Sequence, residues 1–307
     1  MRRLAPAAAL LLALWGCAGP AGPRSPLPAG SEASPAQGIQ DAAARDAAIR
    51  FIHAYATAPQ DGGTALTGVV DGLASDWAHW FDVQNATFDG AVTGQASILS
   101  VGPPASTNGA TPAVVVDVQA SVTFTYAPSD GSSLAPQVRS LDGPMLLAQV
   151  GPYDYRVEDF TRDGQALHSF FASLAGPGTV REGIRVSVHA VIVSGATWQV
   201  GLDVRNSSAS SIEVGSSNVG LFLDQQIVPG TVVSTFDPIQ PGTTEEGFVT
   251  LPAPAGAGQL ALVLRFGSSV EPIDFVIAIP DPREATGQSV PSSSPSPAPS
   301  GDGALAG

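Results

Sequence analysis

One stretch of the chain alternates strictly between apolar and polar side chains: Val116-Asp117-Val118-Gln119-Ala120-Ser121-Val122-Thr123-Phe124-Thr125-Tyr126. Successive side chains of a β-strand point to opposite faces of the sheet, so a period of two gives one apolar and one polar face. The stretch therefore predicts a long strand with one buried face. It decides the fold of the first half of this 307-residue chain.

The segments before this strand have the period of helices. In residues 41–58 the apolar side chains recur at steps of three and four, with Asp41 available as N-cap and Pro59 just beyond. The same period runs through residues 66–81, although Gly68 and Gly72 weaken it. We predict one amphipathic helix in each segment.

Three more segments of the first half have strand character: residues 87–101, 145–150 and 153–160. Loops rich in Gly, Pro and Asn separate them, which is typical of short connections between antiparallel strands. Helices followed by an antiparallel sheet make an α+β domain.

The second half, residues 181–280, is strand-like throughout. Two alternating runs, 184–192 and 198–204, flank a short turn at Ser194-Gly195 and predict a hairpin. Further short strands are expected at residues 212–214, 219–223, 232–236, 247–251, 260–266 and 273–279. This density, about seven or eight strands in about 100 residues, predicts an all-β sandwich.

The composition excludes several kinds of chemistry. No lysine occurs among the 13 basic residues, and the chain has one cysteine and four histidines. It therefore lacks a lysine for a Schiff base or a phosphate loop and a cysteine pair for a disulfide or zinc site, and the histidines are far apart. We expect no metal and no cofactor. The net charge of −14 also argues against a nucleic-acid partner, because phosphate contacts need clustered positive charge.

The amino terminus has the layout of a secretory signal, with two arginines, an apolar run through residues 4–15, then Gly16 and Cys17. The run is shorter than the roughly 20 residues that span a bilayer. The sequence Leu14-Trp15-Gly16-Cys17 resembles the lipobox of bacterial lipoproteins. In that family a leucine stands three residues before the invariant cysteine and a small residue stands directly before it.

The lipobox resemblance implies cleavage after Gly16 and attachment of diacylglycerol to the sulfur of Cys17. Two acyl chains hold a protein stably on a membrane, whereas one chain gives only marginal affinity. We therefore expect an exported protein that is anchored to the outer face of the cell membrane, with the membrane as its partner through the acyl chains. The alternative is an ordinary signal peptide with an incidental cysteine.

Two low-complexity segments flank the folded halves. After a signal peptide of residues 1–16, residues 17–40 are rich in Ala, Gly, Pro and Ser and are expected to be a disordered tether. Residues 281–307 have a similar composition and are expected to be a disordered tail.

The first half, about residues 41–167, resembles the nuclear-transport-factor-two-like fold of many secreted bacterial proteins. The resemblance rests on the order of helices and strands and on the ending Tyr153-Asp154-Tyr155-Arg156-Val157-Glu158-Asp159-Phe160-Thr161-Arg162-Asp163-Gly164. In that family a helix packs into the concave side of a curved sheet, giving a cone-like domain, and some members use the cavity for ligands or catalysis.

If the first half encloses such a cavity, its lining is expected to be aromatic. The candidate lining residues are Trp77, Trp80, Phe88, Phe124 and Tyr126, with His79, Asp82 and Asp89 as possible polar groups. Catalysis would require one carboxylate to be desolvated beside a Tyr or His donor. The alternative is a sealed aromatic core with solvated carboxylates.

The second half resembles immunoglobulin-like modules of unassigned function in bacterial lipoproteins. The resemblance rests on Val200-Gly201-Leu202-Asp203-Val204-Arg205-Asn206 and on Gln240-Pro241-Gly242-Thr243-Thr244-Glu245-Glu246-Gly247-Phe248-Val249. It covers most of residues 181–280, with residues 168–180 as a connector, and it implies a binding or spacer role.

The sequence favours a non-enzymatic, lipid-anchored interaction module of the cell envelope, which binds an unidentified envelope protein or ligand. No catalytic residues are assigned. Two alternatives stay open: a small-molecule binder or enzyme that uses the cavity of the first half, and a structural spacer.

Overall fold

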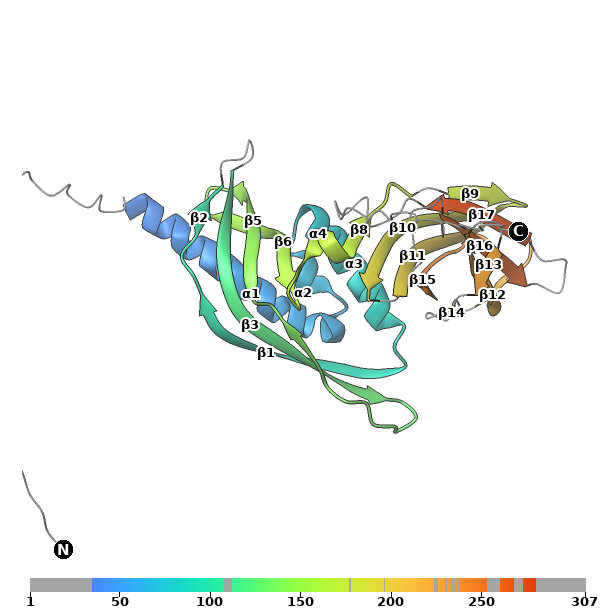
Figure 1. The fold of residues 1–307 in the computed structure, drawn as a ribbon, viewed down its shortest axis with the longest axis horizontal. Coiled ribbons are helices and arrows are strands. Elements are labelled where there is room, and N and C mark those ends of the chain that lie inside the picture. Colours follow the sequence, from blue (N-terminus) through green and yellow to red (C-terminus); the bar gives the residue numbers. More distant parts are fainter. Residues whose placement is uncertain are drawn as a thin grey trace, which may run out of the picture.

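The computed structural model describes residues 35–107, 112–176, 178–195, 197–223, 226–229, 231–232, 236, 238–252, 260–267 and 273–279. The predictions for the signal peptide 1–16 with Gly16, for Cys17, for the tether as far as residue 34 and for the tail 281–307 lie outside these residues. The described chain has few helices, and all pairings between its named strands are antiparallel (Figure 1). The predicted class of mixed helices and antiparallel sheets is confirmed.

The first half forms one curved sheet with helices on its concave side (Figure 1). Its strands, in spatial order, are β1 (Gly90–Val101), β3 (Ala113–Pro128), β5 (Gly143–Gly151), β6 (Asp154–Arg162) and β7 (Gln165–Ala166); β2 (Ala105–Ser106) and β4 (Gln137–Ser140) also pair with β3. Strand β3 contains the alternating stretch. Its apolar side chains from Val116 to Phe124 are buried, which confirms the predicted strand.

Helix α1 (Pro35–Asp61) lies against this sheet, and its predicted apolar face is buried. The helix begins six residues before the predicted N-cap, Asp41, so residues 35–40 are helical rather than part of an unstructured tether. Proline is well tolerated at a helix start, where its missing N–H costs no hydrogen bond. The helix also continues two residues past Pro59, because a proline disturbs little when almost no helix follows it.

The second predicted helix is broken into α2 (Thr64–Thr67) and α3 (Gly72–Ala86). Between them, the backbone of Val69 accepts a hydrogen bond from Val157 of β6 at 3.0 Å, and Asp71 donates one back to Val157 at 2.9 Å. Asp71 then caps α3 through its side chain. The prediction of one continuous helix was wrong because this pairing with a distant strand replaces a helical turn.

The second half forms two antiparallel sheets. One contains, in spatial order, β14 (Thr231–Val232), β15 (Thr244–Pro252), β11 (Thr197–Asn206), β10 (Ile184–Ser194) and β8 (Phe171–Ser173), with β9 (Gly178–Arg181) on β10. The other contains β13 (Gln226–Pro229), β12 (Glu213–Leu223), β16 (Leu260–Gly267) and β17 (Ile273–Ile279). Buried side chains of both sheets, such as Leu202 and Phe275, share one hydrophobic core. The predicted hairpin of β10 and β11 is confirmed.

The segment between the halves is structured. Helix α4 (Leu167–Phe170) follows β7, and β8 and β9 both pair with β10. Residues 168–180, expected as a connector, therefore contain strands of the second half. The buried core of the first half also extends onto Ile192 and Phe248 of the second.

Candidate functional site

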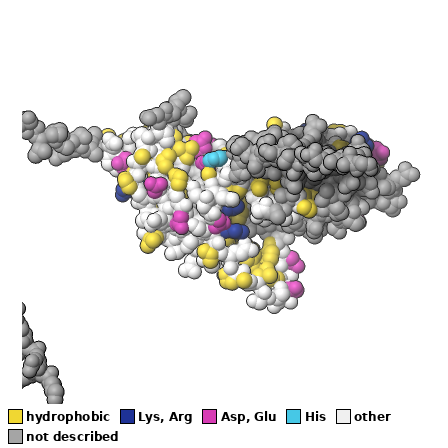
Figure 2. Space-filling view, in the orientation of Figure 1, with side chains coloured by type: hydrophobic (Ala, Val, Ile, Leu, Met, Phe, Trp, Pro, Cys, Tyr) yellow, Lys and Arg dark blue, Asp and Glu magenta, His cyan; other side chains and the backbone are white. Residues whose placement is uncertain are grey.

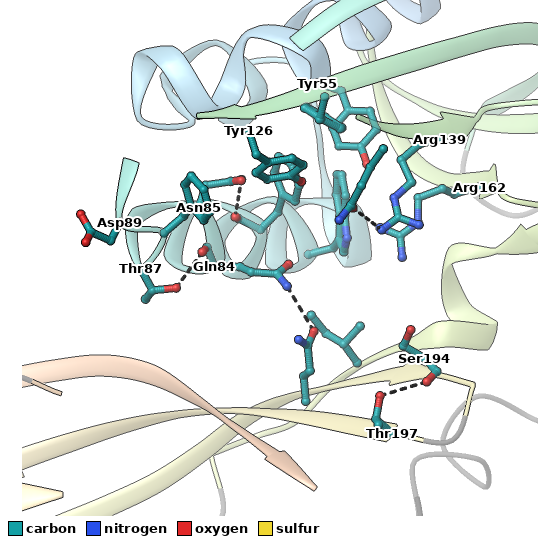
Figure 3. A pocket seen from close by; sticks show the side chains of 17 residues that line it. Tyr55, Gln84, Asn85, Thr87, Asp89, Tyr126, Arg139, Arg162, Ser194 and Thr197 are labelled. Carbon is teal, nitrogen blue, oxygen red and sulfur yellow. Dashed lines mark hydrogen bonds between the residues drawn. The ribbon is translucent and has the colours of Figure 1, made fainter. Parts of the chain in front are cut away.

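A cavity of about 450 Å³ lies where the first half meets the β10–β11 hairpin. Its wall comes from α1, α3 and the residues just after it, from β3, β4 and β6, and from the hairpin (Figure 3). The lining residues are Tyr55, Trp77, Phe81, Gln84, Asn85, Thr87, Phe88, Asp89, Phe124, Tyr126, Gln137, Arg139, Arg162, Ile192, Ser194, Thr197 and Gln199. The cavity is thus a composite of both halves.

One side of the cavity is aromatic. Phe124 and Tyr126 stand two residues apart on β3, so they point to the same face of the sheet. The ring of Phe88 packs edge-on against Tyr126 at 5.2 Å between centroids, and Tyr55 packs edge-on against Phe124 at 5.3 Å. These rings form an apolar surface, and their edge-on contacts are an arrangement that aromatic pairs prefer.

Four of the five residues expected in the cavity line it: Trp77, Phe88, Phe124 and Tyr126. The fifth, Trp80, does not. Three helical positions separate it from Trp77 and turn its side chain by about 60°, toward β11 and β15. Phe81, one turn after Trp77, lines the cavity instead. It belongs to the same apolar period, which could have identified it.

Trp80 forms the junction between the halves. Only 4% of it is exposed, and its ring packs edge-on against Phe248 at 5.3 Å. A side-chain carbon at Gly201 would lie 2.6 Å from the indole, so the ring lies directly on the backbone of β11. Beside it, His79 pairs with Glu246 at 3.2 Å. Strand β11 can therefore stand this close to α3 only because residue 201 is a glycine.

Of the three polar groups expected in the cavity, one lines it and two do not. Asp89 lies on the cavity wall, at its end away from Arg139 and Arg162, and its carboxylate points away from them (Figure 3). His79 lies at the junction with Glu246, outside the wall. Asp82 also lies outside the wall, and desolvation raises the pKa of its carboxyl above the ordinary 3.8, although His79 acts in the opposite direction.

Two arginines of the cavity wall are not among the residues predicted from the sequence. Arg139 of β4 and Arg162 of β6 reach the same end of the cavity, next to the hydroxyl of Tyr55 (Figure 3). Burial raises the pKa of that phenol above its ordinary 10.0, while the two guanidinium groups act to lower it. The strand residues before and after each arginine gave no signal that the two would meet.

The hairpin closes the remaining side. Gln84 of α3 donates a hydrogen bond to Gln199 of β11 at 3.3 Å across the junction. Nearby, Thr197 donates to the backbone of Ser194 at 3.0 Å and lies on the rim of the cavity (Figure 3). This rim is polar, in contrast to the aromatic side.

The sequence matches no protein-family model and no curated protein. Within the described residues, no group of three or more His, Cys, Asp or Glu could hold a metal ion. None of the described helices is long and apolar enough to cross a membrane. The cavity therefore has to be interpreted from its own chemistry: aromatic rings on one side, polar groups on the rim and two guanidinium groups at one end.

Proposed function

We propose that the chain is an exported, lipid-anchored and non-enzymatic binding protein of the cell envelope, with the composite cavity as its ligand site. In this proposal the first half is a nuclear-transport-factor-two-like domain and the second is an immunoglobulin-like sandwich. Acyl chains on Cys17 hold both at the outer face of the cell membrane. The lipobox-like sequence supports the anchor, and the cavity supports the binding role.

The composite wall of the cavity is the observation on which the binding role depends. Ligand sites commonly occur at domain interfaces and have volumes of roughly 300–1,000 Å³, with mainly aromatic or apolar walls and a few polar groups. The cavity, at about 450 Å³, fits this position and volume, whereas its wall is mixed: seven aromatic or apolar residues and ten polar or charged residues line it. The packing of Trp80 on Gly201 fixes one half against the other, so the cavity is preformed.

Binding fits the wall better than catalysis does. General acid or base chemistry in the cavity would need a carboxylate close to a suitable donor. His79 and Asp82 lie outside the wall, and Asp89 points away from Tyr55 and the arginines (Figure 3). The groups expected for the enzymatic alternative are therefore not brought together.

The binding role can be tested with a thermal-shift screen of the full chain against small molecules. A ligand at about 100 times its dissociation constant adds about 2.7 kcal/mol to stability. The blocking variant is Thr197→Trp, which places a large ring on the rim of the cavity. The matched control is Thr93→Trp, which places the same ring on the exposed side of β1.

We expect ligands that stabilise the wild type and the Thr93→Trp variant but not the Thr197→Trp variant. If both tryptophan variants respond like the wild type, the ligand binds outside the cavity and the proposal is wrong. If no compound stabilises the wild type, the binding role is likewise contradicted, and the spacer alternative gains support.

A further inference from the structure

The two arginines of the cavity are positively charged, although the protein as a whole is acidic. The chain has a net charge of −14, yet the charged groups at one end of the cavity wall are Arg139 and Arg162. In the space-filling view, dark blue atoms, which all belong to arginines in this lysine-free chain, lie near the middle of the face shown (Figure 2). Such a local excess of positive charge attracts anions.

One carboxylate, which is not among the residues that line the cavity, interacts with both arginines. Asp163 accepts a hydrogen bond from Arg139 at 3.2 Å and lies 4.0 Å from Arg162. It is fixed in place by a second hydrogen bond, from the backbone of Ser140 at 2.9 Å. Two guanidinium groups that share one carboxylate keep about one unit of positive charge in excess. Asp89, the carboxylate among the residues that line the cavity, lies at its far end (Figure 3).

The guanidinium groups are held in position. Arg162 is 19% exposed and its guanidinium carbon lies 4.1 Å from the centre of the Phe170 ring. Arg139 donates a hydrogen bond to Gln137 at 3.1 Å. A guanidinium has more N–H donors than these contacts use, and its planar fork matches a carboxylate. Because the two arginine side chains are already ordered, less conformational entropy is lost from them when an anion binds.

We infer that the cavity binds a monocarboxylate whose carboxylate meets Arg139 and Arg162 and whose aromatic or aliphatic body lies along Phe88, Phe124 and Tyr126. This inference rests on the proposed function, because it names the ligand class of the same cavity. A carboxylate balances the single excess positive charge. A phosphate ester with two negative charges would leave one of them uncompensated in a partly desolvated site.

The experiment is calorimetric titration of the full chain with 4-phenylbutyrate and octanoate. The neutral probes are 4-phenylbutanol and octanol, which have the same bodies, and inorganic phosphate is the second anion. The variant is Arg139→Gln, which removes the charge from a side chain that is 40% exposed. The matched control is Arg50→Gln on the outside of α1, where Arg50 pairs with Asp46. Circular dichroism checks that both variants fold.

We expect the acids to bind about tenfold more tightly than the alcohols, as charge-assisted hydrogen bonds are the stronger kind. We expect Arg139→Gln to remove that difference and leave the alcohols unchanged, and Arg50→Gln to change nothing. Equal binding of acids and alcohols by the wild type would overturn the carboxylate inference and leave the binding cavity in place. Acid binding that survives Arg139→Gln, or phosphate binding as tight as that of the acids, would also overturn it.

Absence of binding by acids and alcohols alike would overturn the inference too. The proposed function fails on different observations: an equal response of the Thr197→Trp and Thr93→Trp variants to a stabilising ligand, or a screen in which no compound stabilises the wild type. The two failures are therefore distinguishable.

Discussion

At the scale of single residues, Gly201 is the most constrained position at the junction. Its backbone has no positive φ, so the constraint is purely one of space: a side-chain carbon would lie 2.6 Å from the ring of Trp80. The indole is itself buried against Phe248 and has no room to retreat. Any side chain at this position would force the two halves apart.

We predict that Gly201→Ala destabilises the full chain by about 1–3 kcal/mol, the usual cost of overpacking. Gly38→Ala is the matched control, since a side-chain carbon there meets nothing within 4 Å and helix propensity favours alanine. Urea unfolding measures both. A loss of stability in the control that equals the loss at Gly201 would contradict the steric explanation.

Asp82 gives a prediction on pH. Desolvation, the first of its causes, raises the pKa of this carboxyl above 3.8, so the folded state holds the proton more tightly than the unfolded state. The contribution of Asp82 to stability is therefore fully present below pH 3.8 and is lost as the pH rises through the higher, folded-state pKa. Asp82→Asn removes this loss.

We expect Asp82→Asn to be more stable than the wild type at pH 7 and to show a smaller fall in stability as the pH is raised from about 4. Urea unfolding across that range provides the measurement. A variant that is less stable than the wild type at pH 7 would show that the carboxylate, rather than the acid, is the favoured form in the folded protein.

At the scale of elements, β3 shows what the sequence could predict. Its alternation of apolar and polar side chains fixes which face is buried, and the structure buries that face. The α2–α3 break was not predictable in this way. It depends on hydrogen bonds between Val69, Asp71 and Val157, and a local period contains no information on a strand so far along the chain.

The residues of the cavity likewise fall into those that a local sequence pattern predicts and those that it does not. Phe124 and Tyr126 could be placed by the period of one strand, and Trp77 by the period of one helix. Arg139 and Arg162 come from different strands, and they meet because the chain at the end of β6 reaches β4, where the backbone of Asp163 donates a hydrogen bond to Ser140 at 2.9 Å. Trp80 was misplaced because helical periodicity identifies the apolar face of α3. It does not show that part of this face lines the cavity while Trp80 packs on β11 and β15.

The register of β3 can be tested with two neighbouring substitutions. Val118→Asp puts a carboxylate into the core, where the side chain is 1% exposed, and we expect a loss of several kcal/mol or failure to fold. Gln119→Asp puts the same group on the exposed face and should change stability by less than about 1 kcal/mol. Similar losses at both positions would contradict the alternation.

At the scale of the whole molecule, the two halves act as one structure. The chain passes from α4 into β8, which pairs with β10, and the core of the first half includes Ile192 and Phe248 of the second. The cavity exists only where the halves meet, since its rim comes from the hairpin. A ligand in it would contact both halves at once.

The proposed lipid anchor also concerns the whole molecule. We predict that Cys17→Ala abolishes acyl labelling and moves the protein from the membrane fraction to the soluble fraction, because in the proposed lipoprotein the acyl chains on this cysteine supply the membrane affinity. Cys17→Ser gives a second variant without the acylated sulfur. Membrane association and labelling that persist in both variants would contradict the lipoprotein interpretation and favour an ordinary signal peptide.

The central claim is that both halves line one binding cavity, and photo-labelling measures this most directly. A 4-phenylbutyrate probe with a diazirine is irradiated with the full chain, and labelled peptides are mapped by mass spectrometry. We predict adducts in residues 84–89 or 124–126 together with adducts in residues 192–199, all displaced by unlabelled 4-phenylbutyrate and absent from the Thr197→Trp variant. Adducts confined to one half, or adducts that an excess of unlabelled compound does not displace, would contradict the claim.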